Sequence, residues 1–137
     1  MRIYLIIILF ACISACNSKP SNNANADTSS RQVEAQKPEI SSQEALDLVQ
    51  NQGFTFIDVR TPKEIADGKM EGALEINYKA DDFQEKISQL DRDGKYVLYC
   101  RSGGRSGQAW TLMNELGFKN VKDATDGFSS INDALNK

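Results

Sequence analysis

From residue 39 onward, short apolar runs alternate with segments of helical pattern, and this alternation limits the folds open to the chain. Runs rich in β-branched and aromatic residues have the length of buried strands, and they lie at residues 54–59, 72–77, 95–99 and 118–122. Strands that alternate with helices favour a parallel sheet covered by helices on both faces. Because the whole chain has 137 residues, we expect one such α/β domain, over residues 39–137.

Local signals predict where several helices begin and end. Ser41 followed by Glu44 has the form of a capping box, and Gly53 is placed to end the helix that follows it. Thr61 followed by Pro62 predicts a second helix start, since proline suits the first helical position. Apolar spacing predicts three further helices, over residues 82–90, 106–116 and 132–136.

The N-terminus has the pattern of a targeting signal. Arg2 precedes an apolar run at residues 3–15, which is too short to span a bilayer, because a spanning helix needs about 17–25 residues. A short basic start, an apolar middle and small residues at the end are typical of a secretory signal. The sequence Ile-Ser-Ala-Cys ending at Cys16 resembles the bacterial lipobox. That resemblance implies removal of residues 1–15 and lipidation of Cys16.

A polar segment separates Cys16 from the predicted domain. Residues 17–38 are rich in Asn, Ser, Ala and Gln, and Val33 is their only large aliphatic residue. Such a segment cannot bury enough apolar area to offset the entropy cost of ordering. We therefore interpret residues 16–38 as a lipidated N-terminus and disordered tether. The expected location is extracytoplasmic, with a lipid anchor in a bacterial membrane, on the periplasmic side or in an outer membrane.

Composition excludes several classes of function. The formal net charge of −3 and a sequence pI near 5.0 leave no basic footprint for nucleic acid. The absence of histidine excludes Ser-His-Asp and Cys-His nucleophile pairs within the chain, and imidazole metal ligands with them. Cys12, Cys16 and Cys100 are too few and too scattered for a disulfide scaffold or a thiolate zinc site. We expect no metal and no other cofactor.

The strongest chemical signal is the loop Cys-Arg-Ser-Gly-Gly-Arg-Ser that begins at Cys100. It follows a predicted strand and opens a predicted helix, where active sites of such sheets gather. Backbone N–H groups and the helix start both favour an anion there. Gly103 and Gly104 allow the backbone to curl with positive φ, and Arg101 and Arg105 add positive charge. The pKa of the Cys100 thiol should therefore be lowered.

This loop and its surroundings resemble the rhodanese domain family, from about residue 40 to the C-terminus. Four segments carry the resemblance: Asp-Val-Arg-Thr-Pro-Lys-Glu at 58–64, Gly-Lys-Met-Glu-Gly-Ala at 68–73, Tyr-Cys-Arg-Ser-Gly-Gly-Arg-Ser at 99–106 and Leu-Gly-Phe-Lys-Asn-Val at 116–121. The resemblance implies a rhodanese-like α/β fold. Lys69 and Glu71 stand where members usually have histidine and proline, and Asp-Gly-Phe at 126–128 stands where many have Gly-Gly.

The resemblance also implies a sulfurtransferase. In that family, a thiolate at the position of Cys100 takes a sulfane sulfur from a small anionic donor such as thiosulfate and becomes a persulfide. A thiophilic acceptor, either cyanide or a thiol on a small molecule or partner protein, then removes the sulfur. Asp58 and Arg60 are expected to brace the loop or to form a structural ion pair. The residues implied to hold the outer sulfur and the donor are Arg101, Ser102, Gly103, Gly104, Arg105 and Ser106.

Other readings of the same loop stay open. Cysteine phosphatases share this fold and place five residues between cysteine and arginine, whereas four separate Cys100 from Arg105. The shorter spacing makes a tighter ring, suited to a sulfur atom. A thiol–disulfide role would normally need a resolving cysteine, and none remains after processing. The remaining alternative is a non-catalytic binding or persulfide-carrier module, although rhodanese-like domains that have lost activity typically lack the cysteine.

Overall fold

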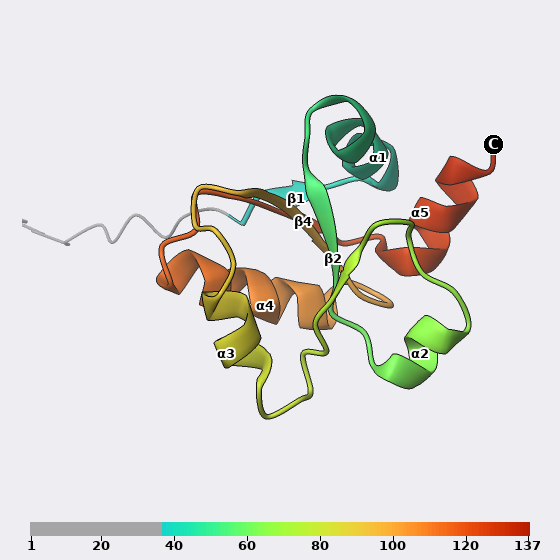
Figure 1. The fold of residues 1–137 in the computed structure, drawn as a ribbon. Helices are drawn as coiled ribbons and strands as arrows, with labels where there is room; N and C mark the ends of the chain where they lie inside the picture. The colour runs from blue at the N-terminus through green and yellow to red at the C-terminus, as the bar shows by residue number, and fades with distance from the viewer. Residues whose placement is uncertain (1–36) are drawn as a thin grey trace, which may run out of the picture. The chain divides into compact units, whose positions relative to one another are not determined.

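The computed structural model describes residues 37–137 (Figure 1). The predicted signal peptide, Cys16 and most of the predicted tether lie outside these residues. The strands are β1 (Glu39–Ile40), β2 (Thr55–Asp58), β3 (Leu74–Glu75), β4 (Lys95–Tyr99) and β5 (Asn120–Ala124). The helices are α1 (Ser42–Asn51), α2 (Pro62–Ala66), α3 (Phe83–Ser88), α4 (Gly104–Glu115) and α5 (Gly127–Leu135). Within residues 37–137, no helix is long and apolar enough to cross a membrane.

The described strands form one sheet of five, in the order β1-β5-β4-β2-β3, and every neighbouring pair is parallel. The sheet register pairs Asp58 at the end of β2 with Tyr99 at the end of β4. Asp58 and Cys100 are therefore delivered to the same edge of the sheet. This is the parallel α/β architecture that the sequence predicts.

Helices cover both faces of the sheet, with α3 and α4 on one face and α1 and α5 on the other (Figure 1). The first face is filled by buried side chains that include Phe83, Ile87, Trp110 and Met113. The second is filled by a group that includes Ala45, Leu46, Val97, Tyr99 and Ile131. Burial of each large apolar side chain stabilises the fold by about 1.5–3 kcal/mol, and β4 contributes to both layers. The strands that lead to the loop are thus packed on both faces of the sheet.

The two helix starts predicted from capping signals are confirmed. The Ser41 side chain accepts a hydrogen bond from the Glu44 N–H, and the Glu44 carboxylate accepts from the Ser41 N–H at 2.9 Å, so both halves of the capping box form. Thr61 makes the corresponding box ahead of α2, with Pro62 in the first turn. Gly53 follows the end of α1 with a φ of 73°, a conformation that glycine adopts readily.

Several predicted boundaries are wrong, and the fourth strand shows why. The run at residues 118–122 predicts its start at Phe118, whereas β5 covers Asn120–Ala124. The Phe118 N–H donates to the Met113 carbonyl at 3.1 Å, while Gly117 takes a φ of 87°. These residues close the end of α4, so they are not free to enter the sheet.

Tertiary contacts set the other boundaries. Helix α5 begins at Gly127, five residues before the predicted start at 132. Asp126 just ahead of it accepts hydrogen bonds from the N–H and hydroxyl of Ser42 at 2.9 and 3.0 Å. Strand β1 is absent from the sequence prediction, because its two residues form a strand through pairing with the distant β5. The remaining differences are small: α4 begins at Gly104, while β2, β3 and α3 are shorter than predicted.

Candidate active site

Cys100 directly follows β4, and the residue is 1% exposed. The loop after it curls back and opens α4, with Gly103 at the N-cap position and a φ of 80°. A Cβ atom on Gly103 would lie 2.8 Å from the Thr125 carbonyl oxygen, so this position requires glycine for space as well as for backbone conformation. The tight curl places the backbone N–H groups of the loop around one sulfur atom.

Hydrogen-bond donors surround that sulfur. Burial raises the pKa of the Cys100 thiol, but the backbone N–H groups of Ser106, Ser102 and Arg105 and the Ser106 hydroxyl outweigh it, so the net pKa is lowered. The Ser106 Oγ lies 3.7 Å from the Cys100 Sγ and 3.1 Å from the Gly103 carbonyl oxygen. The Ser106 hydroxyl has a single proton, which it can donate to either the sulfur or the carbonyl oxygen. This arrangement increases the thiolate fraction of Cys100 at a given pH.

Arg105 is held by an acidic partner on another element. Its Nη1 and Nη2 donate to the Glu64 Oε2 and Oε1 at 2.8 and 2.7 Å, a bidentate pair. Arg105 is the main cause that holds the pKa of the Glu64 carboxyl well below its ordinary value. Glu64 also caps α2 by accepting from the N–H and hydroxyl of Thr61. The pair therefore fastens the loop to the start of α2.

Asp58 and Arg60 form a second bidentate pair, deeper in the fold. The Arg60 Nη2 donates to the Asp58 Oδ2 at 2.6 Å, and the Arg60 Nε reaches both carboxylate oxygens. Nη2 also donates to the Gly68 carbonyl at 2.7 Å. The Arg60 guanidinium lies 3.8 Å from the centre of the Phe128 ring, and the Phe128 N–H donates to the Cys100 carbonyl at 2.8 Å. This pair supports the loop through Phe128.

Arg101, Ser102 and Gly104 are the exposed members of the loop. Arg101 lines a hollow of about 340 Å³ beside the loop. The other residues that line it are Arg60, Glu64, Asp67, Phe128 and Ser129. Small molecules that approach the loop meet this mixed set of charges.

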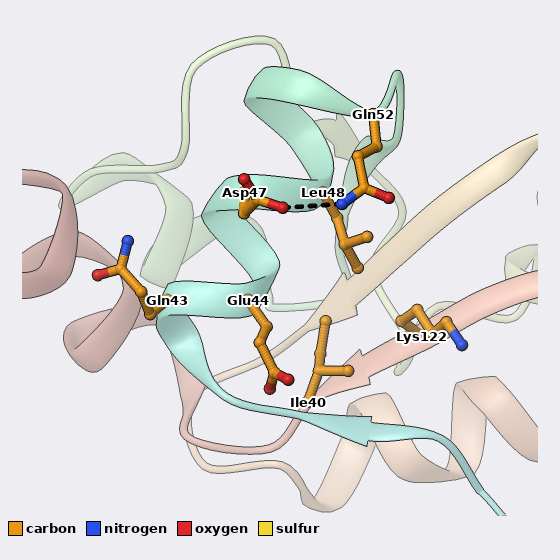
Figure 2. Close-up of a pocket in the computed structure, with 7 residues that line it drawn as sticks. All are labelled: Ile40, Gln43, Glu44, Asp47, Leu48, Gln52 and Lys122. Atoms are coloured by element: carbon orange, nitrogen blue, oxygen red, sulfur yellow. Dashed lines mark hydrogen bonds between the residues drawn. The ribbon is translucent and has the colours of Figure 1, made fainter.

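A larger hollow of about 570 Å³ lies between α1 and the strands β1 and β5, as Figure 2 shows. Ile40 and Leu48 supply apolar side chains there. Its carboxylates already have structural tasks, since Glu44 belongs to the capping box and Asp47 accepts from Gln52 at 2.8 Å. This hollow contains no thiol, so the chemistry of the described residues concentrates at the Cys100 loop.

Sequence reasoning identified the loop but missed several residues that shape it. The Glu64 carboxylate was expected only as part of a helix start. Gly127 has a φ of 82°, and a Cβ atom there would lie 2.1 Å from the Arg101 carbonyl oxygen. A glycine between Asp126 and Phe128 was the available signal for this close approach. No sequence pattern indicates that Asp67 and Ser129 line the hollow beside the loop.

Comparison with known proteins identifies the family. The family model for the rhodanese-like domain matches residues 41–134, so the chain belongs to the rhodanese-like domain family. The chain is 35% identical over 88 residues to thiosulfate sulfurtransferase 16, chloroplastic, of Arabidopsis thaliana, a match that covers 57% of this chain and 73% of that protein. It is 32% identical over 71 residues to thiosulfate sulfurtransferase PspE of Escherichia coli (strain K12), covering 50% of this chain and 66% of that protein.

The fold is also similar to that of solved rhodanese-like structures. The crystal structure of a rhodanese-related protein from Thermoplasma volcanium aligns with a TM-score of 0.62 and 28% identity, covering 70% of this chain and 91% of that one. The architecture described above is therefore a rhodanese-like fold.

Proposed function

We propose that this chain is a sulfurtransferase that carries sulfane sulfur as a persulfide on Cys100. The observation that carries the proposal is the Cys100 sulfur itself, buried at the end of β4 inside a ring of backbone donors that lowers its pKa. The names of the related proteins, which include thiosulfate sulfurtransferases, support this reading.

In the first half-reaction, the Cys100 thiolate attacks the outer sulfur of thiosulfate or a similar donor. A new S–S bond forms on Cys100, the S–S bond of the donor breaks, and sulfite leaves with the electron pair. The terminal sulfur of the persulfide carries negative charge. The N–H groups of Ser102, Arg105 and Ser106 are already oriented toward the thiolate position, so they can stabilise this anion without reorganisation.

In the second half-reaction, cyanide or a thiolate attacks the outer sulfur of the persulfide. The bond between the two sulfur atoms breaks, and its electron pair returns to Cys100 as the thiolate. The product is thiocyanate or a new persulfide on the acceptor. The electron count is unchanged over the cycle, so neither an oxidant nor a reductant is needed.

The spacing of the loop argues against phosphatase chemistry. Cysteine phosphatases place five residues between cysteine and arginine, whereas four separate Cys100 from Arg105, so the ring is tighter and suits a sulfur atom. Glu64 also accepts one N–H from each terminal nitrogen of Arg105, which leaves fewer donors for a phosphate.

The direct test follows sulfur on Cys100. The full chain is incubated with thiosulfate, and intact mass should rise by one sulfur atom; addition of cyanide should remove it and yield thiocyanate. Cys100→Ser exchanges one atom and should lose both signals while keeping the thermal melting curve. Full thiocyanate production by Cys100→Ser would overturn the proposal. Sulfur loading without turnover would indicate a persulfide carrier, and hydrolysis of an aryl phosphate would indicate a phosphatase.

We propose further that the chain acts at a membrane surface, anchored through lipid on Cys16. The support is the short apolar run that ends in the lipobox-like sequence. Expression in a bacterial host should give a lipid-labelled form that has lost residues 1–15. Cys16→Ser should instead accumulate as an unprocessed precursor. A mature protein that retained Met1 would exclude this anchor.

A further inference from the structure

The hollow of about 340 Å³ beside the Cys100 loop is lined by two charged side chains, one positive and one negative, that make no ion pair within residues 37–137. We infer that it recognises a zwitterionic α-amino-acid thiol, such as cysteine, as the sulfur acceptor. The inference rests on the proposed function, because it names the class of acceptor for the same thiol. It predicts a preference for acceptors that carry both an ammonium and a carboxylate group.

Two of the four charged residues of the hollow are already neutralised. Arg60 is paired with Asp58 and also donates to the Gly68 carbonyl. Glu64 has both carboxylate oxygens bound by Arg105. Neither residue has a free charge to offer to a ligand.

Arg101 and Asp67 are the charges that remain. Both are exposed, and neither makes an ion pair within residues 37–137. Arg101 directly follows Cys100 in the loop, whereas Asp67 lies at the end of α2. The Phe128 ring and the Ser129 side chain complete the lining. At about 340 Å³, the hollow is near the lower end of ligand sites, which suits a small molecule.

This pair of charges discriminates between small sulfur compounds. A carboxylate can bind Arg101 through two parallel hydrogen bonds, and an ammonium group can bind Asp67. A compound with only the anionic group gains the first contact and is repelled by Asp67. A compound with only the cationic group gains the second and is repelled by Arg101. An α-amino-acid thiol gains both contacts, and the contact with Arg101 holds it next to the residue that follows Cys100.

The transfer step balances without another reactant. The thiol of the bound amino acid loses its proton to solvent, and its thiolate attacks the outer sulfur of the Cys100 persulfide. One S–S bond forms on the amino acid, and the S–S bond on Cys100 breaks with its electron pair returning to Cys100. The product is the persulfide of the amino acid.

The test compares four thiols on the sulfur-loaded full chain: cysteine, 3-mercaptopropionate, cysteamine and 2-mercaptoethanol. Mass spectrometry follows the loss of sulfur from Cys100, and rates are divided by thiolate concentration. We expect cysteine to be fastest, by about two- to fivefold for each exposed ion pair gained. Asp67→Asn should remove its advantage over 3-mercaptopropionate, and Arg101→Gln its advantage over cysteamine. Glu115→Gln, which removes one charge at the other end of α4, should leave these ratios unchanged.

The outcomes separate this inference from the proposed function. Equal normalised rates for the four thiols, or ratios that Asp67→Asn does not move, would overturn the inference and leave sulfur transfer intact. If Cys100 takes up no sulfur, the proposed function fails. Binding of the zwitterion to the hollow is then tested by an NMR titration with S-methylcysteine, which cannot accept sulfur. Shifts at Arg101 and Ser129 that weaken in Asp67→Asn would support recognition of the zwitterion, and their absence would exclude it.

Discussion

Two arginine–carboxylate pairs support the same loop from different depths. In Asp58–Arg60, the side chains are 0% and 4% exposed, and the pair lies within the end of the sheet. In Glu64–Arg105, they are 28% and 19% exposed, and the pair joins α2 to the loop. Both are bidentate, so their chemistry is alike. Their surroundings decide what each contributes to the protein.

We call Asp58–Arg60 the deep pair and Glu64–Arg105 the shallow pair. Because only the deep pair is fully buried, breaking it should cost more free energy than breaking the shallow pair. A charge left without its partner in the interior lacks both water and a counter-ion. A charge left near the surface regains water and is screened by salt. The deep pair should therefore contribute mainly to the free energy of unfolding, and the shallow pair mainly to the position of the loop.

The largest effect is expected from Asp58→Asn. It leaves the Arg60 guanidinium buried without its counter-charge, so the free energy of unfolding should fall by about 3–5 kcal/mol. Urea denaturation measures this change. The double variant Asp58→Asn with Arg60→Met removes both charges and should recover most of the loss. A single variant as stable as the parent would show that the deep pair does not stabilise the fold.

Glu64→Gln should have a much smaller effect, about 1 kcal/mol or less in urea denaturation. Glutamine keeps the capping box with Thr61, so this variant isolates the ion pair with Arg105. Glu64→Ala also loses the cap contact and should be less stable by up to about 1 kcal/mol more. Equal losses in the two variants would assign the whole effect to the ion pair.

The shallow pair should also appear in the pH dependence of stability. Arg105 holds the pKa of folded Glu64 below its ordinary value. The stabilisation is therefore complete above the unfolded pKa of about 4.3. Below that pH, the unfolded chain binds a proton that the folded chain resists, so stability falls with pH. Glu64→Gln should show a shallower fall between about pH 5 and pH 2. If stability fell equally steeply with pH in the parent and in Glu64→Gln, the ion pair would not be the source of this pH dependence.

The smallest expected effect concerns the Cys100 thiol. Ser106→Ala removes one of several donors to the sulfur, so the pKa of the Cys100 thiol should rise slightly. The rate of iodoacetamide alkylation against pH measures this, with the parent midpoint expected below the free-cysteine value of about 8.5. Glu64→Gln leaves all of these donors in place and should not raise the pKa. A parent midpoint above the free-cysteine value would contradict the anion-binding reading of the loop.

The features that sequence reasoning predicted depend on neighbouring residues. Apolar alternation indicated the strands, Ser41 and Thr61 indicated helix starts, and the glycines after Cys100 indicated a curled loop. The features it missed depend on contacts between distant segments. Strand β1 exists through its pairing with β5, and Arg105 meets a carboxylate 41 positions away. No local pattern encodes such a partner.

The contact between Phe128 and Cys100 has a consequence for how the site is made during synthesis. Every strand of the sheet precedes residues 126–128 in the chain. The Phe128 N–H that holds the Cys100 carbonyl, and the Asp126 carboxylate that holds Ser42, are therefore added after the sheet residues have been translated. A nascent chain that stops at β5 contains Cys100 but lacks these hydrogen bonds from Phe128 and to Asp126. The support that residues 126–128 give to the Cys100 loop is therefore completed last, after the residues that donate to the sulfur have been made.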